Sequence, residues 1–232
     1  MTLEALNKRI VACTKCPRLV KHREAVAHEK RKAYREWHYW GRPVPGFGDP
    51  QARILAVGLA PGAHGSNRTG RQFTGDASGR FLFPALFRAG LASQPESVSR
   101  DDGLRLRGLY ISAACRCVPP GNRPTLLEIS NCRPYLKGEI ELLDPSVIVC
   151  LGRIAFDDVV RLHSRRPSDF VFRHGSTYRL SSDPRASDRW IICSYHPSQQ
   201  NTLTGRLTRS MFDRIWRRAR TLAGYEATES PG

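Results

Sequence analysis

Two polar stretches of the sequence contain side chains that could do chemistry. One runs from Gly58 to Gly79 and sets His64 and Asp76, with an asparagine, two arginines and a phenylalanine, among six glycines. The other is the stretch His196-Pro-Ser-Gln-Gln-Asn201. Glycine has no Cβ and therefore lets backbone amides approach a ligand closely. The first stretch matches neither common nucleotide-binding fingerprint, so by itself it predicts a ligand site without identifying the ligand.

Four of the seven cysteines are spaced as metal ligands: Cys13, Cys16, Cys117 and Cys132. The first two form a C-x-x-C before a proline, and the other two are separated by fourteen residues. Four thiolates from two distant segments can hold a tetrahedral zinc ion or a [4Fe–4S] cluster, and the spacing does not choose between them. Cys115 is a competing ligand. Cys150 and Cys193 lie in apolar runs, which predicts buried thiols.

The chain that must position these groups alternates between short apolar runs and longer helical patterns. The apolar runs predict four buried strands, at 53–59, 108–114, 146–152 and 190–195. Helices are predicted at 3–12, 18–37, 79–91, 126–143 and 204–222, with another beginning at 152. Pro134 does not suit a helix interior, so we expect the regular part of the fourth helix to begin only there. The segment 170–189 is expected to be irregular or a hairpin.

This alternation predicts an α/β fold with one domain of three layers, αβα, around a central, mostly parallel four-stranded sheet. The domain is expected to span residues 1–225. Its first fifty residues form a helical and loop part that carries two of the cysteines, and residues 226–232 are expected to be a frayed tail. The loops at 58–79, 117–124 and 196–201 each follow a strand. If the strands are parallel, all three loops meet at one edge of the sheet.

The charge of the chain points to a polyanionic partner. Its 232 residues include 37 Lys and Arg against 21 Asp and Glu, a formal net charge of +16, and nucleic acid is the usual partner of such an excess. No run approaches the roughly 20 apolar residues of a membrane span. The first residues lack the apolar stretch of a secretory signal, so we expect a cytoplasmic protein.

The two polar stretches resemble the uracil-DNA glycosylase superfamily and, within it, family 5, the B-type enzymes with an iron–sulfur cluster. The run from Gly58 to Asp76 resembles the first motif of that family throughout, and His196-Pro-Ser-Gln-Gln-Asn201 resembles its H-P-S-x-x-N motif. The resemblance extends from about residue 8 to residue 220. Gln72 is a departure, since proline is common at that position.

The resemblance implies a monofunctional DNA glycosylase that extrudes a damaged nucleotide, hydrolyses its N-glycosidic bond and leaves an abasic site. It implies Asp76 and His196 as the catalytic residues, the first acting on the water or the sugar and the second donating to the departing base. Phe73 would stack on the base, Asn122 would read its edge, and the pocket would include Gly62, Ala63 and His64. The implied DNA contacts are Arg68, Arg71, Ser198, Gln199, Gln200, Asn201 and Arg206.

The resemblance also bears on the cofactor and on the range of substrates. It implies a [4Fe–4S] cluster with Cys117 rather than Cys115 as the third ligand, because the third cysteine of the related families opens a C-x-P-P-like turn. The sister family 4 carries a carboxylate and an asparagine where this chain has Leu59 and Ala113. The family-5 resemblance accommodates both, and it implies a wider choice of deaminated bases, such as hypoxanthine beside uracil. A monomer is expected.

Several of these roles have structural alternatives. Asp76 could cap the helix that begins near Ser78, Asn122 could brace its proline-rich turn, and Phe73 could be a core residue. Two other functions also remain open. One is an iron–sulfur protein that binds damaged DNA without catalysis, and the other is a zinc-dependent hydrolase of nucleosides or nucleotides.

Overall fold

A computed structural model describes residues 1–163, 165–180 and 189–225. In these residues the chain forms a six-stranded sheet with the order β1-β3-β2-β4-β6-β5. Four strands are parallel and central: β2 (Ile54–Gly58), β3 (Leu109–Ala113), β4 (Val147–Leu151) and β6 (Trp190–Ser194). These are the four predicted strands, and they confirm the mostly parallel sheet. The predicted tail at 226–232 lies outside the described residues.

The prediction of four strands was too low, because each edge of the sheet carries one short antiparallel strand. β1 (Phe47–Gly48) pairs with β3, and β5 (Thr177–Arg179) pairs with β6. β5 falls in the segment expected to be irregular or a hairpin. Both strands are two or three residues long, and the register with a neighbour, rather than an apolar run of their own, makes them strands.

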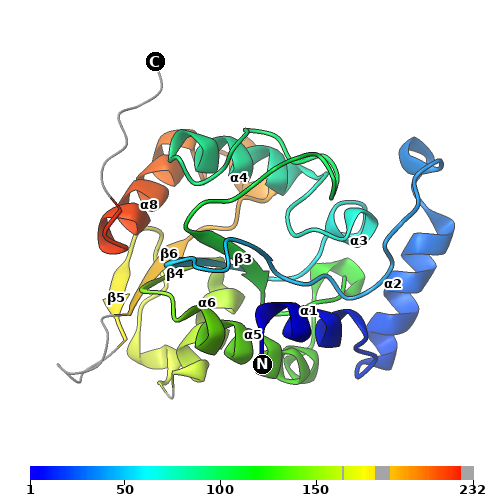
Figure 1. Cartoon of the computed structure of the whole chain (residues 1–232), viewed down its shortest axis with the longest axis horizontal. Coiled ribbons are helices and arrows are strands. Elements are labelled where there is room, and N and C mark those ends of the chain that lie inside the picture. Colours follow the sequence, from blue (N-terminus) through cyan, green and yellow to red (C-terminus); the bar gives the residue numbers. More distant parts are fainter. Residues whose placement is uncertain (164, 181–188, 226–232) are drawn as a thin grey trace.

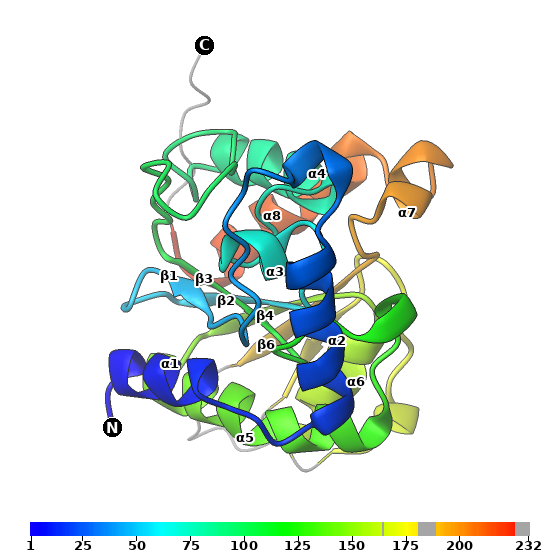
Figure 2. The same ribbon diagram turned by 90° about the vertical axis from the view of Figure 1, so that its right-hand side faces the viewer.

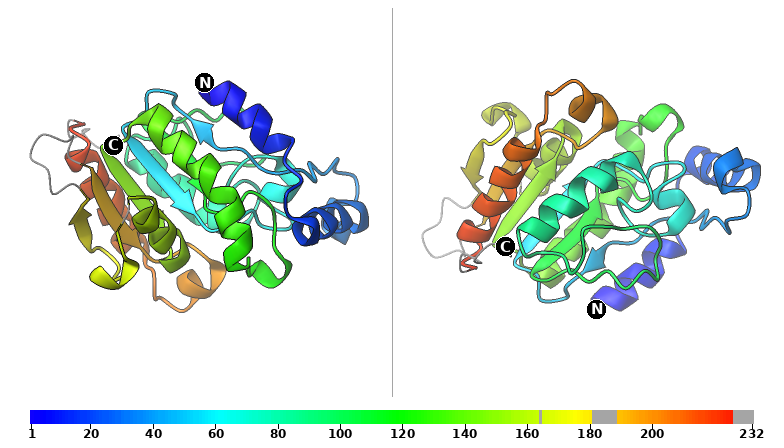
Figure 3. Two further views of the ribbon diagram at one scale, coloured as in Figure 1. Left: turned by 90° about the horizontal axis from the view of Figure 1, so that it is seen from below. Right: turned by 90° about the horizontal axis from the view of Figure 1, so that it is seen from above.

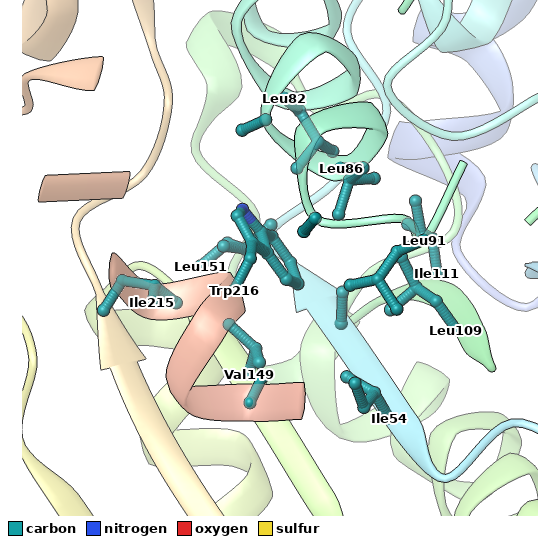
Figure 4. Close-up of a cluster of buried hydrophobic side chains, with 14 of the residues drawn as sticks. Ile54, Leu82, Leu86, Leu91, Leu109, Ile111, Val149, Leu151, Ile215 and Trp216 are labelled. Carbon is teal, nitrogen blue, oxygen red and sulfur yellow. The ribbon is translucent and has the colours of Figure 1, made fainter. Parts of the chain in front are cut away.

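Helices cover both faces of the sheet and give the predicted three layers (Figures 1 and 3). On one face α4 (Ala77–Arg88) and α8 (Arg209–Leu222) pack on alternate residues of the central strands. Trp216 of α8 is wholly buried there, between Leu82 and Leu86 of α4 and Val149 and Leu151 of β4 (Figure 4). A side chain of this size removes roughly 150–250 Å² from water, so it anchors this layer.

The opposite face is covered by α5 (Leu126–Leu143) and α6 (Arg153–Leu162), which bury the other side of the same strands. α1 (Leu3–Val11) then packs on α5, since Leu6 and Ile10 form one apolar cluster with Tyr135. The N-terminal part of the chain is therefore joined to the body through α5.

α5 is continuous over the whole predicted range, so the expectation that Pro134 would delay its regular part was wrong. The helix begins at a capping box in which the Thr125 hydroxyl and the Glu128 side chain each bond the other's backbone amide. Pro134 and Ser130, whose carbonyl loses its partner to the proline, both lie on the exposed side of the helix. Water can therefore satisfy the carbonyl that proline leaves free.

The other helices of the described residues are α2 (Pro17–Glu29) and several short ones. α2 ends well before the predicted residue 37. Its C-cap is Lys30, whose φ of +52° cannot continue a right-handed helix. It is followed by η1 (Lys32–Tyr34), and α3 (Ser66–Thr69), η2 (Pro120–Asn122), η3 (Pro167–Asp169) and α7 (Gln199–Leu203) are the other short helices of the described residues. Among the described residues, no helix is both long enough and apolar enough to cross a membrane.

Candidate active site

A cleft of about 820 Å³ opens at the carboxyl edge of the sheet, where the three predicted loops meet. Its lining includes ten of the residues selected from the sequence: Gly62, Ala63, His64, Phe73, Asp76, Asn122, His196, Ser198, Gln199 and Gln200. Two further lining residues, Arg31 and Tyr34, come from the segment after α2. The cleft is large enough for one nucleotide, since ligand pockets typically measure roughly 300–1,000 Å³.

Asp76 has two roles, because it caps a helix and faces the cleft at the same time. Its Oδ1 accepts a hydrogen bond from the backbone N–H of Gly79 at 2.9 Å, which makes it the N-cap of α4. Its Oδ2 points at Gly62 and Gly65, and a Cβ added at Gly62 would lie 2.9 Å from it. Burial raises the pKa of the Asp76 carboxyl, and the backbone amides of Ser78 and Gly79 partly oppose that rise.

His196 follows the end of β6, and its backbone is held by the loop that it begins. The side-chain amide of Asn201 donates to the His196 carbonyl at 2.8 Å, so Asn201 points inward and not toward a ligand. Burial lowers the pKa of His196 to about 4. The imidazole is therefore neutral near pH 7, with one N–H available as a donor.

Phe73 lies against His196, with ring centroids 5.8 Å apart and planes at 29°. Only 7% of Phe73 is exposed, and its φ is +54°. A Cβ added at Gly58 would lie 2.7 Å from the phenylalanine ring, so the glycine at the end of β2 makes room for it. Phe73 thus belongs both to the core and to the floor of the cleft. The sequence had left open whether it is a core residue or a residue of the site, and its position is compatible with both.

His64 occupies another side of the cleft, where a tyrosine fixes its ring. The hydroxyl of Tyr39 accepts from the backbone N–H of Arg31 at 3.4 Å and lies 3.1 Å from Nδ1 of His64. Burial lowers the pKa of His64, and the nearby charges of Arg31 and Arg68 lower it further. A neutral imidazole with Nδ1 as the acceptor fits these contacts.

Asn122 lies at the exposed rim of the cleft, on η2. It has a φ of +57°, and Gly121 before it has a φ of +59°, a tight double turn that presents the side chain outward. The backbone N–H of Asn122 bonds the carbonyl of Pro119 at 3.1 Å. Its side-chain amide has no hydrogen bond to any described residue, so the backbone and not the side chain braces the turn.

The residues proposed from sequence as DNA contacts divide into two groups. Ser198, Gln199 and Gln200 lie on the rim, where Ser198 is the N-cap of α7. Arg206 lies outside the cleft with its guanidinium 4.6 Å from the ring centroid of Tyr195.

Arg68 and Arg71 form the second group, and both are buried rather than presented to solvent. Arg71 makes an ion pair with Asp102 at 2.6 Å. Arg68 bonds the carbonyls of His64 and Gly75. Nη1 of Arg68 has no hydrogen-bond partner among the described residues, but it is buried as well. Because both side chains are buried and held by the protein, we no longer assign these two arginines to phosphates. Sequence reasoning missed this because Asp102, the partner of Arg71, lies about thirty residues away, and because local spacing did not show that the Arg68 side chain turns back onto its own loop.

The four cysteines named from sequence line one small cavity together: Cys13, Cys16, Cys117 and Cys132. Among the described residues, no three His, Cys, Asp or Glu side chains already stand in the arrangement of a metal site. Two donors nevertheless point at these sulfurs: Arg23 reaches Sγ of Cys117 at 3.2 Å, and Asn131 reaches Sγ of Cys16 at 3.4 Å. Four soft donors in an apolar cavity, with polar groups that favour thiolates, fit a metal or cluster.

The neighbouring thiols are placed differently. Cys115 does not line this cavity, and its Sγ lies 3.5 Å from the carbonyl of Cys117. Between them, Arg116 is buried in an ion pair with Glu139 of α5, which fixes the loop that carries Cys117 to the helix that carries Cys132. Cys150 and Cys193 are fully buried in β4 and β6, as predicted.

Comparison with known proteins agrees with the site. The family model described as the uracil DNA glycosylase superfamily matches residues 45–220. The type-5 uracil-DNA glycosylase of Thermus thermophilus is 53% identical over 225 residues, which cover 97% of this chain and 100% of the relative. That of Pyrobaculum aerophilum is 47% identical, over 93% of this chain and 91% of the relative.

A more distant relative shows which branch is nearer. The type-4 uracil-DNA glycosylase of Archaeoglobus fulgidus is 30% identical, over 85% of this chain and 82% of the relative. The family model and the relatives of similar length identify the same family, and the two polar loops that resemble its motifs meet in one cleft. The chain therefore belongs to the uracil DNA glycosylase superfamily, and within it to the type-5 group.

Proposed function

We propose that this protein is a monofunctional DNA glycosylase that excises uracil from DNA and leaves an abasic site. The observation that carries the proposal is the meeting of Asp76 and His196, from α4 and the end of β6, in one cleft whose floor is Phe73. The type-5 relatives that share nearly the full length of the chain support the same activity. A protein that only gripped DNA would need neither side chain.

The cleft supplies what cleavage of an N-glycosidic bond requires. The target nucleotide must leave the base stack, and Phe73 offers a ring on which the extruded base stacks. As the bond breaks, the base gains negative charge. A neutral His196 N–H aimed at its carbonyl oxygen stabilises that charge, and one such donor is typically worth roughly 3–4 kcal/mol.

Asp76 acts on the sugar side of the same bond. The sugar passes through an oxocarbenium-like state, and a carboxylate beside it either opposes the positive charge or activates the attacking water. Asp76 is held for this by its bond to Gly79, and Gly62 and Gly65 leave its Oδ2 free of a neighbouring Cβ.

We further propose that the pocket takes other deaminated bases, with hypoxanthine as the first to test. Leu59 and Ala113 line the cleft and offer no hydrogen-bonding side chain that would restrict it to uracil. Asn122 at the rim is the residue we expect to read the base edge, because its side-chain amide is uncommitted.

The four cysteines are proposed to hold a [4Fe–4S] cluster. When bound, the cluster would brace the N-terminal helices against the loop at 115–118 and α5, since metal binding contributes folding free energy. The chain's own residues prepare the site: Arg23 and Asn131 donate to two of the sulfurs. DNA is the proposed partner of a monomer, and the cytoplasmic location stays a prediction.

Single-turnover excision on matched duplexes that carry uracil or hypoxanthine tests the function. Alkali cleaves the strand wherever an abasic site has formed. We expect cleavage of both duplexes, and an undamaged duplex is the control. Binding of uracil-containing DNA with no abasic site would overturn the proposal and favour the non-catalytic alternative. A colourless protein that contains zinc but no iron or sulfide would overturn the cluster.

A further inference from the structure

The segment from Arg31 to Gly41 lies along the outside of the loop that carries the site. Trp40 N–H donates to the Arg68 carbonyl at 2.9 Å, and Gly41 N–H donates to the Asn67 carbonyl at 3.1 Å. The Tyr39 hydroxyl joins the backbone of Arg31 to the ring of His64. Figures 1 and 2 show α2, which leads into this segment, standing beside α3 and beyond the sheet. The segment is therefore fixed against the cleft along its length.

Arg68 holds the turn at the start of this segment. Its guanidinium carbon lies 4.0 Å from the ring centroid of Tyr34 and 4.0 Å from that of Trp37. The two rings are nearly perpendicular, at 85°, so the guanidinium lies in the corner that they form. Its Nε donates to the His64 carbonyl at 2.7 Å and its Nη2 to the Gly75 carbonyl at 3.2 Å. Arg68 thus clamps the turn to His64 and Gly75 of the loop at 58–79, which we call the catalytic loop.

Two exposed arginines line the cleft: Arg80, whose charge acts on Asp76, and Arg31, which lies on the His64 side next to the clamp. Arg31 and Tyr34 both line the cleft. Arg31 is exposed, and no carboxylate pairs with it in the part of the chain that the structure describes. Its charge nevertheless reaches into the site, because it acts on His64.

Resting on the proposed function, we propose that Arg31 binds a DNA phosphate next to the extruded nucleotide, with Tyr34 and Arg68 positioning it. A nucleotide drawn into this cleft directs its base toward Phe73 and His196. The phosphates on either side of that nucleotide then remain at the mouth. There an exposed guanidinium can donate two parallel hydrogen bonds to one phosphate. Arg31 is a substrate-binding residue in this arrangement, and Tyr34 and Arg68 are positioning residues.

The salt dependence of binding tests Arg31 against a matched control. Arg35 is an exposed arginine four residues further on that does not line the cleft. The probe is a duplex with 2′-fluorinated deoxyuridine, which slows bond cleavage so that binding alone is measured. We expect Arg31→Ala to weaken binding. The slope of log K (K being the association constant) against log salt concentration is negative, and its magnitude should fall by about 0.9, the value of one phosphate contact. Arg35→Ala is expected to leave that slope unchanged.

Methylphosphonates identify the phosphate. When the phosphates beside the uracil are made neutral, parent and Arg31→Ala should bind equally, whereas neutral phosphates several nucleotides away should preserve the difference. Equal slopes for Arg31→Ala and Arg35→Ala would overturn the assignment. Since this is a binding measurement, it tests Arg31 whether or not the parent excises uracil, so its failure is distinct from failure of the proposed function.

Tyr34 tests the clamp. Tyr34→Phe keeps a ring over Arg68 and should bind as the parent does, whereas Tyr34→Ala should raise KM several-fold with little change in kcat. A loss of kcat with unchanged KM would show that the clamp does not position a DNA contact.

Discussion

At the scale of single residues, burial drives both proposed catalytic groups, His196 and Asp76, toward their neutral forms. It lowers the pKa of His196 to about 4 and raises the pKa of the Asp76 carboxyl. A neutral imidazole suits a donor that must stabilise an anionic base, because it adds no competing charge beside the developing cation of the sugar. A carboxylate with a raised pKa loses its charge at a higher pH than an ordinary aspartate as the solution becomes acidic.

Asp76→Asn separates the two roles of this residue. The asparagine oxygen can still accept from Gly79 and cap α4, but it carries no charge. We expect the single-turnover rate to fall by about 100-fold or more, the usual range for such a group, while binding of the uracil duplex and stability stay close to those of the parent. The acid limb that Asp76 gives to the parent's pH–rate profile should disappear as well.

Asp76→Ala is the companion variant, because it removes the cap together with the charge. It should lose about 1 kcal/mol of stability that Asp76→Asn keeps, measured by thermal unfolding. A parent-like rate in Asp76→Asn would remove the carboxylate from the mechanism.

His196 is expected to stay unprotonated well below pH 6. Ring nitrogen shifts followed by NMR should show a midpoint near 4, with His196→Gln used to assign the signal. Because the folded pKa lies below the unfolded value of about 6.5, the unfolded chain takes up a proton first. His196 therefore weakens folding as the pH falls from about 6.5 toward 4. A midpoint near 6.5 would contradict the buried, neutral donor.

The residue types of the site could be predicted from sequence, but the residues that its arginines contact could not. Arg68 and Arg71 lie in a glycine-rich loop, and the sequence therefore predicted that they contact phosphates. Their partners are Tyr34, Trp37 and Asp102, about thirty residues away in either direction, and only the folded chain brings these together. Arg31 was missed for the converse reason, because nothing in a charged helical pattern marks which of its cations faces a cleft.

At the scale of elements, the glycines of the catalytic loop make room for a carboxylate. A Cβ on Gly65 would overlap Oδ2 of Asp76, whereas one on Gly62 would approach it at 2.9 Å. Gly65→Ala should therefore displace the carboxylate and lower the single-turnover rate by at least about 10-fold, with a smaller loss in Gly62→Ala. Circular dichroism should show that both variants keep the fold. Equal, parent-like rates would mean that the loop adjusts without moving Asp76.

The central strands were predictable because each is a short apolar run buried on both faces, as Ile54–Gly58 is throughout. The edge strands were not, since Phe47–Gly48 is a strand only through its register with β3. Pro134 misled for a related reason. A proline removes one hydrogen bond from any helix interior. Here the carbonyl that it frees lies on the exposed side, where water can satisfy it, and the exposure of that turn is a tertiary property.

At the scale of the whole molecule, the cysteines join parts of the chain that are far apart in sequence. α2 begins next to Cys16, whereas Cys117 follows β3 and Cys132 lies in α5. Cys132→Ala is expected to lose the brown colour and most of its iron and sulfide, and to lower the unfolding temperature. Cys115→Ala is the matched control, because it removes a buried thiol from the same cluster of side chains without removing a proposed ligand.

Iron and sulfide content, measured beside the visible spectrum, separates the two variants. Loss of the cluster in Cys115→Ala with retention in Cys132→Ala would reverse the ligand assignment.

The order of the strands also sets an order of assembly during synthesis. A chain emerges from the ribosome N-terminus first, so all four cysteines, β2 and β3 are available once residue 132 has appeared. His196 follows β6, which pairs with β4 late in the sequence, and α8 closes that face afterwards. All four proposed ligands are therefore synthesised before the cleft is complete. A chain cut short before β6 would contain every proposed ligand but would lack His196, the proposed donor to the departing base.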